Sequence, residues 1–256
     1  MSRVTRRQIL RGASTAAAAA ILTPVGRRGA SAATPVQVLS SRYPALEYYA
    51  DRIRKAVPDL PVEMQMMPFD KSLELITIAL SSKSQSVDLV YATDRNLTGK
   101  PIYKTAHCLL LAPAEAALKK AVELAANIGM TLKIFDAYRP PQAQQVLWDF
   151  LPDPTYIADL KRGSNHSRGT AIDLTLVDAQ GQDLDMGTGF DEMSIASEHF
   201  HPGLPEHVQR NRTLLLGVMH GAGFTHIPSE WWHYELPGSR ALDLIDNADS
   251  GPLRLM

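Results

Sequence analysis

The sequence predicts an α+β protein with a mixed or antiparallel central sheet and flanking helices. Three observations support this class. Residues 113–129 have apolar side chains at helical spacing, and residues 170–177 are rich in β-branched and apolar side chains, as in a buried strand. Asp178–Gly181 is typical of a hairpin turn. Because helices and strands do not alternate regularly, a wholly parallel sheet is not expected.

Further elements follow from apolar periodicity and from the glycines and prolines at their ends. They are a strand at Thr131–Phe135, a helix at Gln142–Phe150, a helix at residues 206–220, and short strands at residues 224–227 and 231–236. Pro140 and Pro141 suit the first turn of the helix that follows them. Gly129 ends the helix of residues 113–129, and Gly221 and Gly223 end the helix of residues 206–220.

Residues 35–86 have a different pattern, which predicts a short βαβαβ extension with right-handed crossovers. Its strands and helices are expected at Val36–Leu39, Pro44–Val57, Pro61–Met67, Phe69–Ser82 and Val87–Tyr91. The chain then divides into three parts: a leader at residues 1–32, a βαβα extension at residues 33–86, and the main domain at residues 87–256.

Residues 1–32 have the features of an export signal. Arg6 and Arg7 are followed by an Ala-rich apolar stretch that extends to about Val25, and Ala30–Ala32 supplies small residues for a signal peptidase. The apolar run is too short for a transmembrane helix. The sequence therefore predicts export by the twin-arginine route, a periplasmic location and no membrane span. The alternative is an amphipathic N-terminal helix of the fold.

Charge and cysteine content exclude some classes of function. The formal net charge of −1 and the absence of a basic stripe in the sequence argue against nucleic-acid binding. The one cysteine, Cys108, excludes an intramolecular disulfide, and its apolar neighbours predict a buried, inert thiol. The sequence gives no information on oligomeric state.

Two separate segments carry the residue types of a metal site. Residues 164–173 read SNHSRGTAID and contain His166 and Asp173; residues 230–233 read EWWH and contain Glu230 and His233. Two imidazoles and one carboxylate are three ligands for a catalytic zinc, with the fourth position left for water. A glutamate near them is a suitable base to activate that water. The sequence therefore predicts a metallopeptidase with one zinc per chain, in a cleft at the sheet.

Each of these residues taken alone has a simpler interpretation. His166 is also consistent with a surface loop, and Asp173 with a buried carboxylate satisfied by backbone hydrogen bonds. Trp231, Trp232 and Tyr234 are typical of a core or a pocket wall, and Trp232 is expected in the core.

Four other segments complete a recognisable set: YATDRNLTGKP at residues 91–101, FDAYRP at 135–140, DMGTGFDEM at 185–193 and QRNR at 209–212. With the two metal segments, they closely resemble the VanX-type D-alanyl-D-alanine dipeptidases from about residue 87 to about residue 238. That family is zinc-dependent and cleaves the free dipeptide D-Ala-D-Ala.

The resemblance implies a role for each matching residue. His166, Asp173 and His233 are expected to bind zinc, and Glu230 to act as the general base. Arg139 is expected to stabilise the oxyanion of the tetrahedral intermediate. Three further residues are expected to shape the substrate pocket: Ser164, Tyr91 and Asp191. Asp191 matches the position that holds the ammonium group of the dipeptide.

Two of these residues also have an alternative structural interpretation. Arg139 also fits an exposed turn before Pro140 and Pro141, and Asp191 also fits the N-cap of a following helix. The extension at residues 33–86 departs from the family and resembles the opening of a periplasmic solute-binding lobe; a simpler interpretation is a segment that packs on the peptidase.

Three functions remain open. The first is a periplasmic D,D-dipeptidase that acts in peptidoglycan dipeptide turnover. The second is a D,D-carboxypeptidase that acts on peptidoglycan stem peptides. The third is a solute-binding protein with a vestigial peptidase half. A carboxylate at Asp191 favours the first, because a carboxypeptidase must leave the amino end of its substrate free to extend.

Overall fold

The computed structural model describes residues 75–77, 81–82 and 85–256. The predicted leader at residues 1–32 and most of the predicted extension at residues 33–86 lie outside the described residues, and the predicted domain boundary between residues 86 and 87 stays a prediction.

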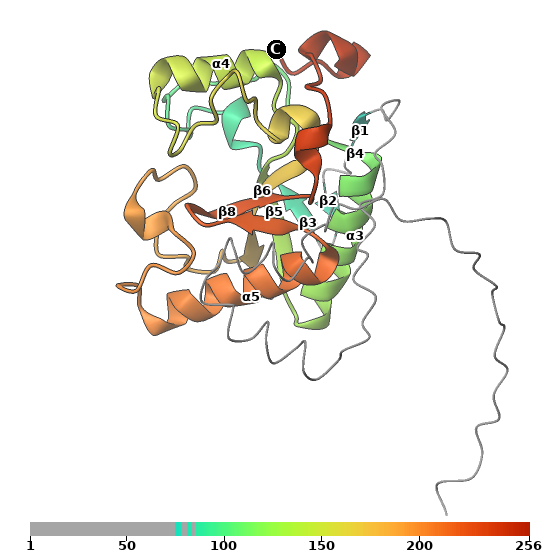
Figure 1. Ribbon diagram of the computed structural model, residues 1–256. Helices are drawn as coiled ribbons and strands as arrows, with labels where there is room; N and C mark the ends of the chain where they lie inside the picture. The colour runs from blue at the N-terminus through green and yellow to red at the C-terminus, as the bar shows by residue number, and fades with distance from the viewer. Residues whose placement is uncertain (1–74, 78–80, 83–84) are drawn as a thin grey trace, which may run out of the picture. The chain divides into compact units, whose positions relative to one another are not determined.

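A mixed sheet forms the centre of the described part (Figure 1). Its strands, in spatial order, are β2 (Ser81–Ser82), β3 (Gln85–Val87), β5 (Thr131–Asp136), β6 (Ala171–Val177), β8 (Glu230–Glu235) and β7 (Thr225–Ile227). Strands β3 and β5 are parallel, and the other neighbouring pairs are antiparallel. The predicted α+β class with a mixed sheet is confirmed.

A second, two-stranded antiparallel sheet joins β1 (Leu75–Thr77) to β4 (Leu109–Leu111). The helix predicted over Phe69–Ser82 is therefore wrong at β1 and β2. The apolar segment of β1 pairs with the buried strand β4, and this long-range pairing overrides the local helical spacing. The strand predicted at Val87–Tyr91 is also wrong beyond Val87, because the chain turns into a 3₁₀ helix that contains Tyr91.

The three α-helices within residues 85–256 agree with the helices predicted there. They are α3 (Ala112–Asn127), α4 (Pro141–Phe150) and α5 (Glu206–Ala222). Pro141 occupies the first turn of α4, where its missing N–H costs no helical hydrogen bond. Gly223 ends α5 with φ of 108°, a backbone conformation that glycine adopts without strain.

Short 3₁₀ helices occupy several connections. They are η2 (Val90–Ala92), η3 (His166–Arg168), η4 (Ile195–Ser197), η5 (Ser239–Ala241) and η6 (Asn247–Leu253). The predicted hairpin turn after β6 is confirmed: the Asp178 N–H donates to the carbonyl oxygen of Gln182 at 2.9 Å.

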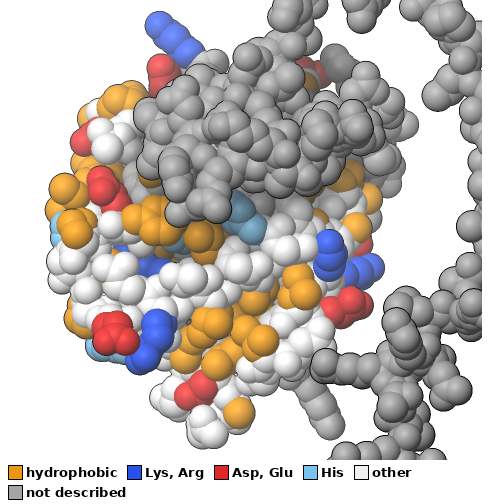
Figure 2. All heavy atoms as spheres, turned by 60° about the horizontal axis from the view of Figure 1, so that its bottom comes forward, with side chains coloured by type: hydrophobic (Ala, Val, Ile, Leu, Met, Phe, Trp, Pro, Cys, Tyr) orange, Lys and Arg blue, Asp and Glu red, His pale blue; other side chains and the backbone are white. Residues whose placement is uncertain are grey.

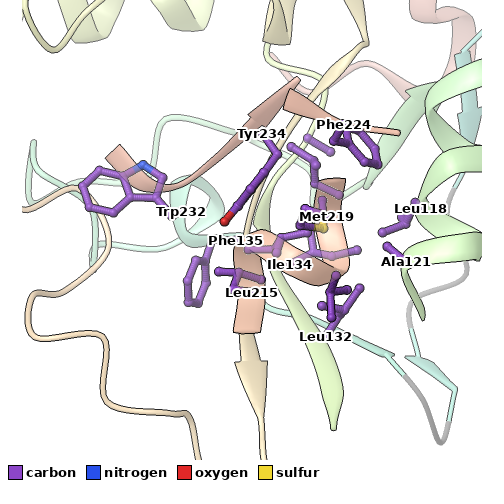
Figure 3. Close-up of a cluster of buried hydrophobic side chains, with 14 of the residues drawn as sticks. Leu118, Ala121, Leu132, Ile134, Phe135, Leu215, Met219, Phe224, Trp232 and Tyr234 are labelled. Carbon is purple, nitrogen blue, oxygen red and sulfur yellow. The ribbon is translucent and has the colours of Figure 1, made fainter. Parts of the chain in front are cut away.

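The main core lies between the sheet and the pair α3 and α5 (Figures 1 and 3). In Figure 3, Leu118 of α3 and Met219 of α5 lie near Ile134 of β5, and all three are buried. Trp232 and Tyr234 of β8 join this core, as expected for Trp232. A second apolar cluster, which includes residues of α4, covers the chain around Tyr91 and Tyr138. Side chains of β5, β6 and β8 belong to the first cluster.

The buried thiol of Cys108 agrees with the prediction, and burial raises its pKa to about 12. On the face shown in Figure 2, Lys and Arg side chains are scattered among acidic and hydrophobic ones. None of the helices in the part of the chain that the structure describes is long and apolar enough to cross a membrane.

Candidate metal centre

Strand pairing places the predicted metal ligands together. Asp173 of β6 pairs directly with His233 of β8, and on its other side with Asp136 of β5. His166 lies in η3, just before β6, and Gly169 at the end of η3 has φ of 65°, which lets the chain turn back into the sheet. His166, Asp173 and His233 are all buried, and one ligand atom of each lies within 4.8 Å of the other two.

Hydrogen bonds on the outer side of each histidine fix the ring nitrogen that faces inward. His166 Nδ1 lies 2.6 Å from the carbonyl oxygen of Ala137, which can only accept, so Nδ1 carries the proton. His233 Nε2 lies 3.1 Å from a carboxylate oxygen of Glu235 and donates to it in the same way. In the neutral form of each ring, His166 Nε2 and His233 Nδ1 would therefore carry the lone pairs.

These lone pairs converge with a carboxylate oxygen. His166 Nε2 and His233 Nδ1 are 3.1 Å apart, and they lie 3.3 Å and 3.1 Å from Asp173 Oδ1. Tetrahedral zinc ligands with bonds of about 2.0–2.1 Å are separated by about 3.3–3.4 Å. The spacing and the donor types of His166, Asp173 and His233 therefore fit a zinc ion.

The charges around the site also favour a cation. Burial alone lowers the pKa of His233, but its contacts with the carboxylates of Asp173 and Glu235 raise it to about 10, so a metal ion would have to displace a proton from Nδ1 to bind there. Burial raises the pKa of Asp173, and the neighbouring histidines outweigh that effect and lower it well below its usual range. Carboxylates that stay ionised in a buried site require compensating positive charge.

A bulge in β8 places Glu230 near His233. Residues three apart on a regular strand point to opposite faces. The pairing of β8 with β7 shifts, however, so that His226 pairs with Tyr234 while the next residue, Ile227, pairs with Glu230. Such a bulge re-aims side chains near a site. Glu230 is buried, and burial raises its pKa to about 7, with partial compensation from His233. A carboxylate poised near neutral pH suits a general base.

Arg139 lies in the site rather than on the surface, so its interpretation as an exposed turn is wrong. The residue is buried, with its Nε 2.9 Å from Asp136 Oδ2 and its Nη2 3.3 Å from Asp173 Oδ2. Its Nη1 donates to Gln144 Oε1 at 3.1 Å, and its Cζ lies 4.7 Å from the centre of the Tyr91 ring. The guanidinium is thus a cation held in place beside the predicted metal ligands.

Tyr91 connects Arg139 to Asp191. The Tyr91 hydroxyl donates to Asp191 Oδ1 at 3.0 Å, while Asp191 Oδ2 is buried without a hydrogen-bond partner among the described residues. Burial raises the pKa of Asp191 to about 8, with partial compensation from Arg139. The helix N-cap alternative for Asp191 is wrong, because the next helical turn, η4, has Ser194 at its N-cap.

Ser164 lies in the loop before η3, where its hydroxyl accepts the backbone N–H of His166 at 3.2 Å. This bond holds Ser164 beside the predicted metal ligand His166, and the role of Ser164 as a substrate contact stays a prediction.

Two carboxylates beside the predicted site residues were not predicted from the sequence. Asp136 accepts hydrogen bonds from Arg139 and from the Tyr103 hydroxyl, the latter at 2.8 Å. Glu235 orients His233. Glu235 was detectable, since it lies two residues after His233 on a strand and so shares its face. Asp136 lies within the FDAYRP segment, but nothing in that segment distinguishes a partner of Arg139 from a strand-end carboxylate.

A mixed sheet that carries a buried His–Asp–His triad, a nearby carboxylate base and a fixed guanidinium defines a metallopeptidase. The family described as D-ala-D-ala dipeptidase, in the M15 peptidases, matches residues 71–249. The D-alanyl-D-alanine dipeptidase of Escherichia coli K12 is 51% identical over 172 residues, which cover 67% of this chain and 89% of that protein. The chain therefore belongs to the D-Ala-D-Ala dipeptidase family of M15 peptidases.

More distant relatives agree. The D-alanyl-D-alanine dipeptidase of Enterococcus faecium is 35% identical over 170 residues, which cover 58% of this chain and 84% of that protein. The protein of the same name from Streptomyces coelicolor is 34% identical over 173 residues, with the same shares covered.

Proposed function

We propose that this chain is a zinc dipeptidase that hydrolyses the free dipeptide D-Ala-D-Ala to two D-alanines. The observation that carries the proposal is the convergence of three possible ligand atoms, from His166, Asp173 and His233, in a buried site. Family membership and the printed activity of the relatives supply the substrate.

One zinc ion per chain is expected at these three residues. When bound, zinc supplies a Lewis acid that lowers the pKa of its water to about 7. Ala137 and Glu235 hold the two imidazole rings in the orientation and tautomer that binding requires.

The remaining chemistry belongs to side chains of this protein. Glu230, with a pKa near neutrality, accepts a proton from the attacking water and passes it to the leaving amine. Arg139, locked by Asp136 and Gln144, presents positive charge where the carbonyl oxygen of the substrate becomes an oxyanion.

Asp191 is the expected partner of the substrate ammonium group. Its buried Oδ2 lacks a hydrogen-bond partner among the described residues, and a bound ammonium supplies both the donor and the compensating charge. This carboxylate favours a free dipeptide over the stem peptide of a D,D-carboxypeptidase, in which an amide replaces the ammonium. Tyr91 holds Asp191 in place through its hydroxyl.

The proposal includes export by the twin-arginine route, which would place the enzyme in the periplasm. The paired residues Arg6 and Arg7, the apolar stretch and Ala30–Ala32 support a periplasmic enzyme that acts on dipeptide released during peptidoglycan turnover.

The test is hydrolysis by zinc-loaded protein of D-Ala-D-Ala, L-Ala-L-Ala and N-acetyl-D-Ala-D-Ala, with Glu230→Gln as the catalytic control. Turnover of the free D,D-dipeptide alone, lost in the control, is the expected result. Turnover of the acetylated substrate would instead identify a carboxypeptidase, and no turnover of any substrate would contradict the proposal.

A further inference from the structure

The loop that carries Asp191 is fastened to α5 by a buried arginine. We define the Asp191 loop as residues 186–198. Arg212 of α5 donates through Nε and Nη2 to the carbonyl oxygen of Met186, at 2.8 Å and 2.6 Å. It also donates to the carbonyl oxygens of Ala196 at 2.8 Å and Glu198 at 2.6 Å. One guanidinium thus holds both ends of the loop.

The environment of Arg212 indicates a specific geometry. The side chain is 1% exposed, and burial lowers its pKa to about 10, so it stays cationic at neutral pH. A buried cation is costly unless its donors are satisfied, and here backbone carbonyl oxygens satisfy them. Lysine cannot reproduce this arrangement, because its ammonium is a point charge without the planar fork of donors.

Other contacts hold the loop in the same position. Thr188 Oγ1 accepts from Trp231 Nε1 at 2.8 Å and lies 3.0 Å from the hydroxyl of Ser197. Gly187 has φ of 81°, and a Cβ there would lie 2.9 Å from Val208 of α5. The loop therefore packs closely against α5 and β8.

The backbone at Asp191 itself is unusual. Its φ of 60° makes it the one non-glycine residue with positive φ in the described part of the chain. Such a conformation is costly and persists where the surroundings determine it. Asp191 lies between the two loop ends that Arg212 fastens, and its own carboxylate is held by the Tyr91 hydroxyl.

We propose that Arg212 is a positioning residue that aims Asp191 at the ammonium group of the dipeptide, and so sets the preference for a free amino terminus. The inference rests on the proposed function, because it assigns to Asp191 the contact with the substrate.

The test is a double-mutant cycle with Arg212→Lys and Asp191→Asn, assayed on D-Ala-D-Ala with zinc-loaded protein. Arg212→Lys alone should raise KM about 10-fold and lower kcat less, because the ammonium contact is made in both the ground state and the transition state. In the Asp191→Asn background the same change should alter KM less than about 2-fold, because the contact it positions is already lost.

The matched control is Arg210→Lys, on an exposed side chain of the same helix that pairs with Glu206 at 3.4 Å. It should leave KM unchanged. Equal effects of Arg212→Lys in both backgrounds would overturn the proposal, because Arg212 would then act through the fold and not through Asp191. If Asp191→Asn leaves KM at the wild-type value, the contact between Asp191 and the substrate is refuted instead, and with it the proposed site.

A second variant keeps the test decisive if Arg212→Lys does not fold. Thr188→Val removes the hydroxyl that joins the loop to Trp231 while keeping its shape. Run through the same cycle, it should raise KM about 3-fold and only when Asp191 is present. Hydrogen exchange should also quicken at the amides of residues 187–198 in both loop variants, and exchange as slow as in the Arg210→Lys control would overturn the proposal.

Discussion

Glu235 is expected to strengthen zinc binding without touching the metal. Its carboxylate accepts the Nε2 proton of His233 at 3.1 Å, which fixes Nδ1 as the ligand atom. Burial raises the pKa of Glu235, but the contact with His233 outweighs it and brings the pKa to about 2, so the group is ionised at neutral pH. The substitution Glu235→Gln keeps the shape and one acceptor oxygen and removes the charge.

The size of the effect follows from this partial loss. Removing an outer partner of a metal-bound histidine typically costs about 10–100-fold in metal affinity, or about 1.4–2.7 kcal/mol. Because glutamine still accepts the hydrogen bond, the loss should lie near the lower end, at about 10-fold.

The assay is competition for zinc between the protein and a chromophoric chelator at neutral pH. Glu206→Gln, an exposed glutamate on α5, is the matched control and should bind zinc as the wild type does. An affinity within about 2-fold of wild type would refute an orienting role, and a loss beyond about 1,000-fold would indicate a direct ligand instead.

Three other predictions follow from the site and its surroundings. Arg139→Lys loses the planar fork that contacts Asp136, and kcat should fall about 100-fold to 1,000-fold; a rise in KM with unchanged kcat would contradict this. Burial raises the pKa of Asp191 to about 8, so the wild type should lose stability as the pH rises from about 4 to about 8. Asp191→Asn should remove the part of this loss that comes from Asp191, of the order of a few kcal/mol, while the part from Glu230, whose pKa is also raised, should stay; urea unfolding at both ends of that range measures the difference. Burial lowers the pKa of His199 to about 3, so stability should fall as the pH drops below about 6.5, the value in the unfolded chain. His199→Phe should make the free energy of unfolding depend less on pH below about 6.5. An equal pH dependence in the variant and the wild type would contradict the role given to His199.

The sequence was sufficient to name the three residues that the structure brings together at the candidate metal site. An aspartate within an apolar strand needs a partner, and Asp173 indeed pairs with His233 across the sheet. Residue type thus predicted the triad, and the resemblance predicted Arg139, Tyr91 and Asp191. The contacts between Tyr91 and both Asp191 and Arg139 join residues far apart in the sequence, which no local pattern encodes.

Features set by long-range pairing were not predictable. The position of Glu230 relative to His233 depends on a bulge in β8, and a regular strand would have placed them on opposite faces. The helix expected over Phe69–Ser82 was wrong for a similar reason, because Leu75–Thr77 pairs with Leu109–Leu111 more than thirty residues later. Local periodicity carries no information on either pairing.

The most direct test of the central claim is a zinc titration of metal-free protein, with the rate of D-Ala-D-Ala hydrolysis measured at each step. We predict a rate that rises linearly to one zinc per chain and then stays constant, and no zinc-dependent rate in His166→Ala. Hydrolysis that survives complete removal of metal, or that needs a second zinc per chain, would contradict it.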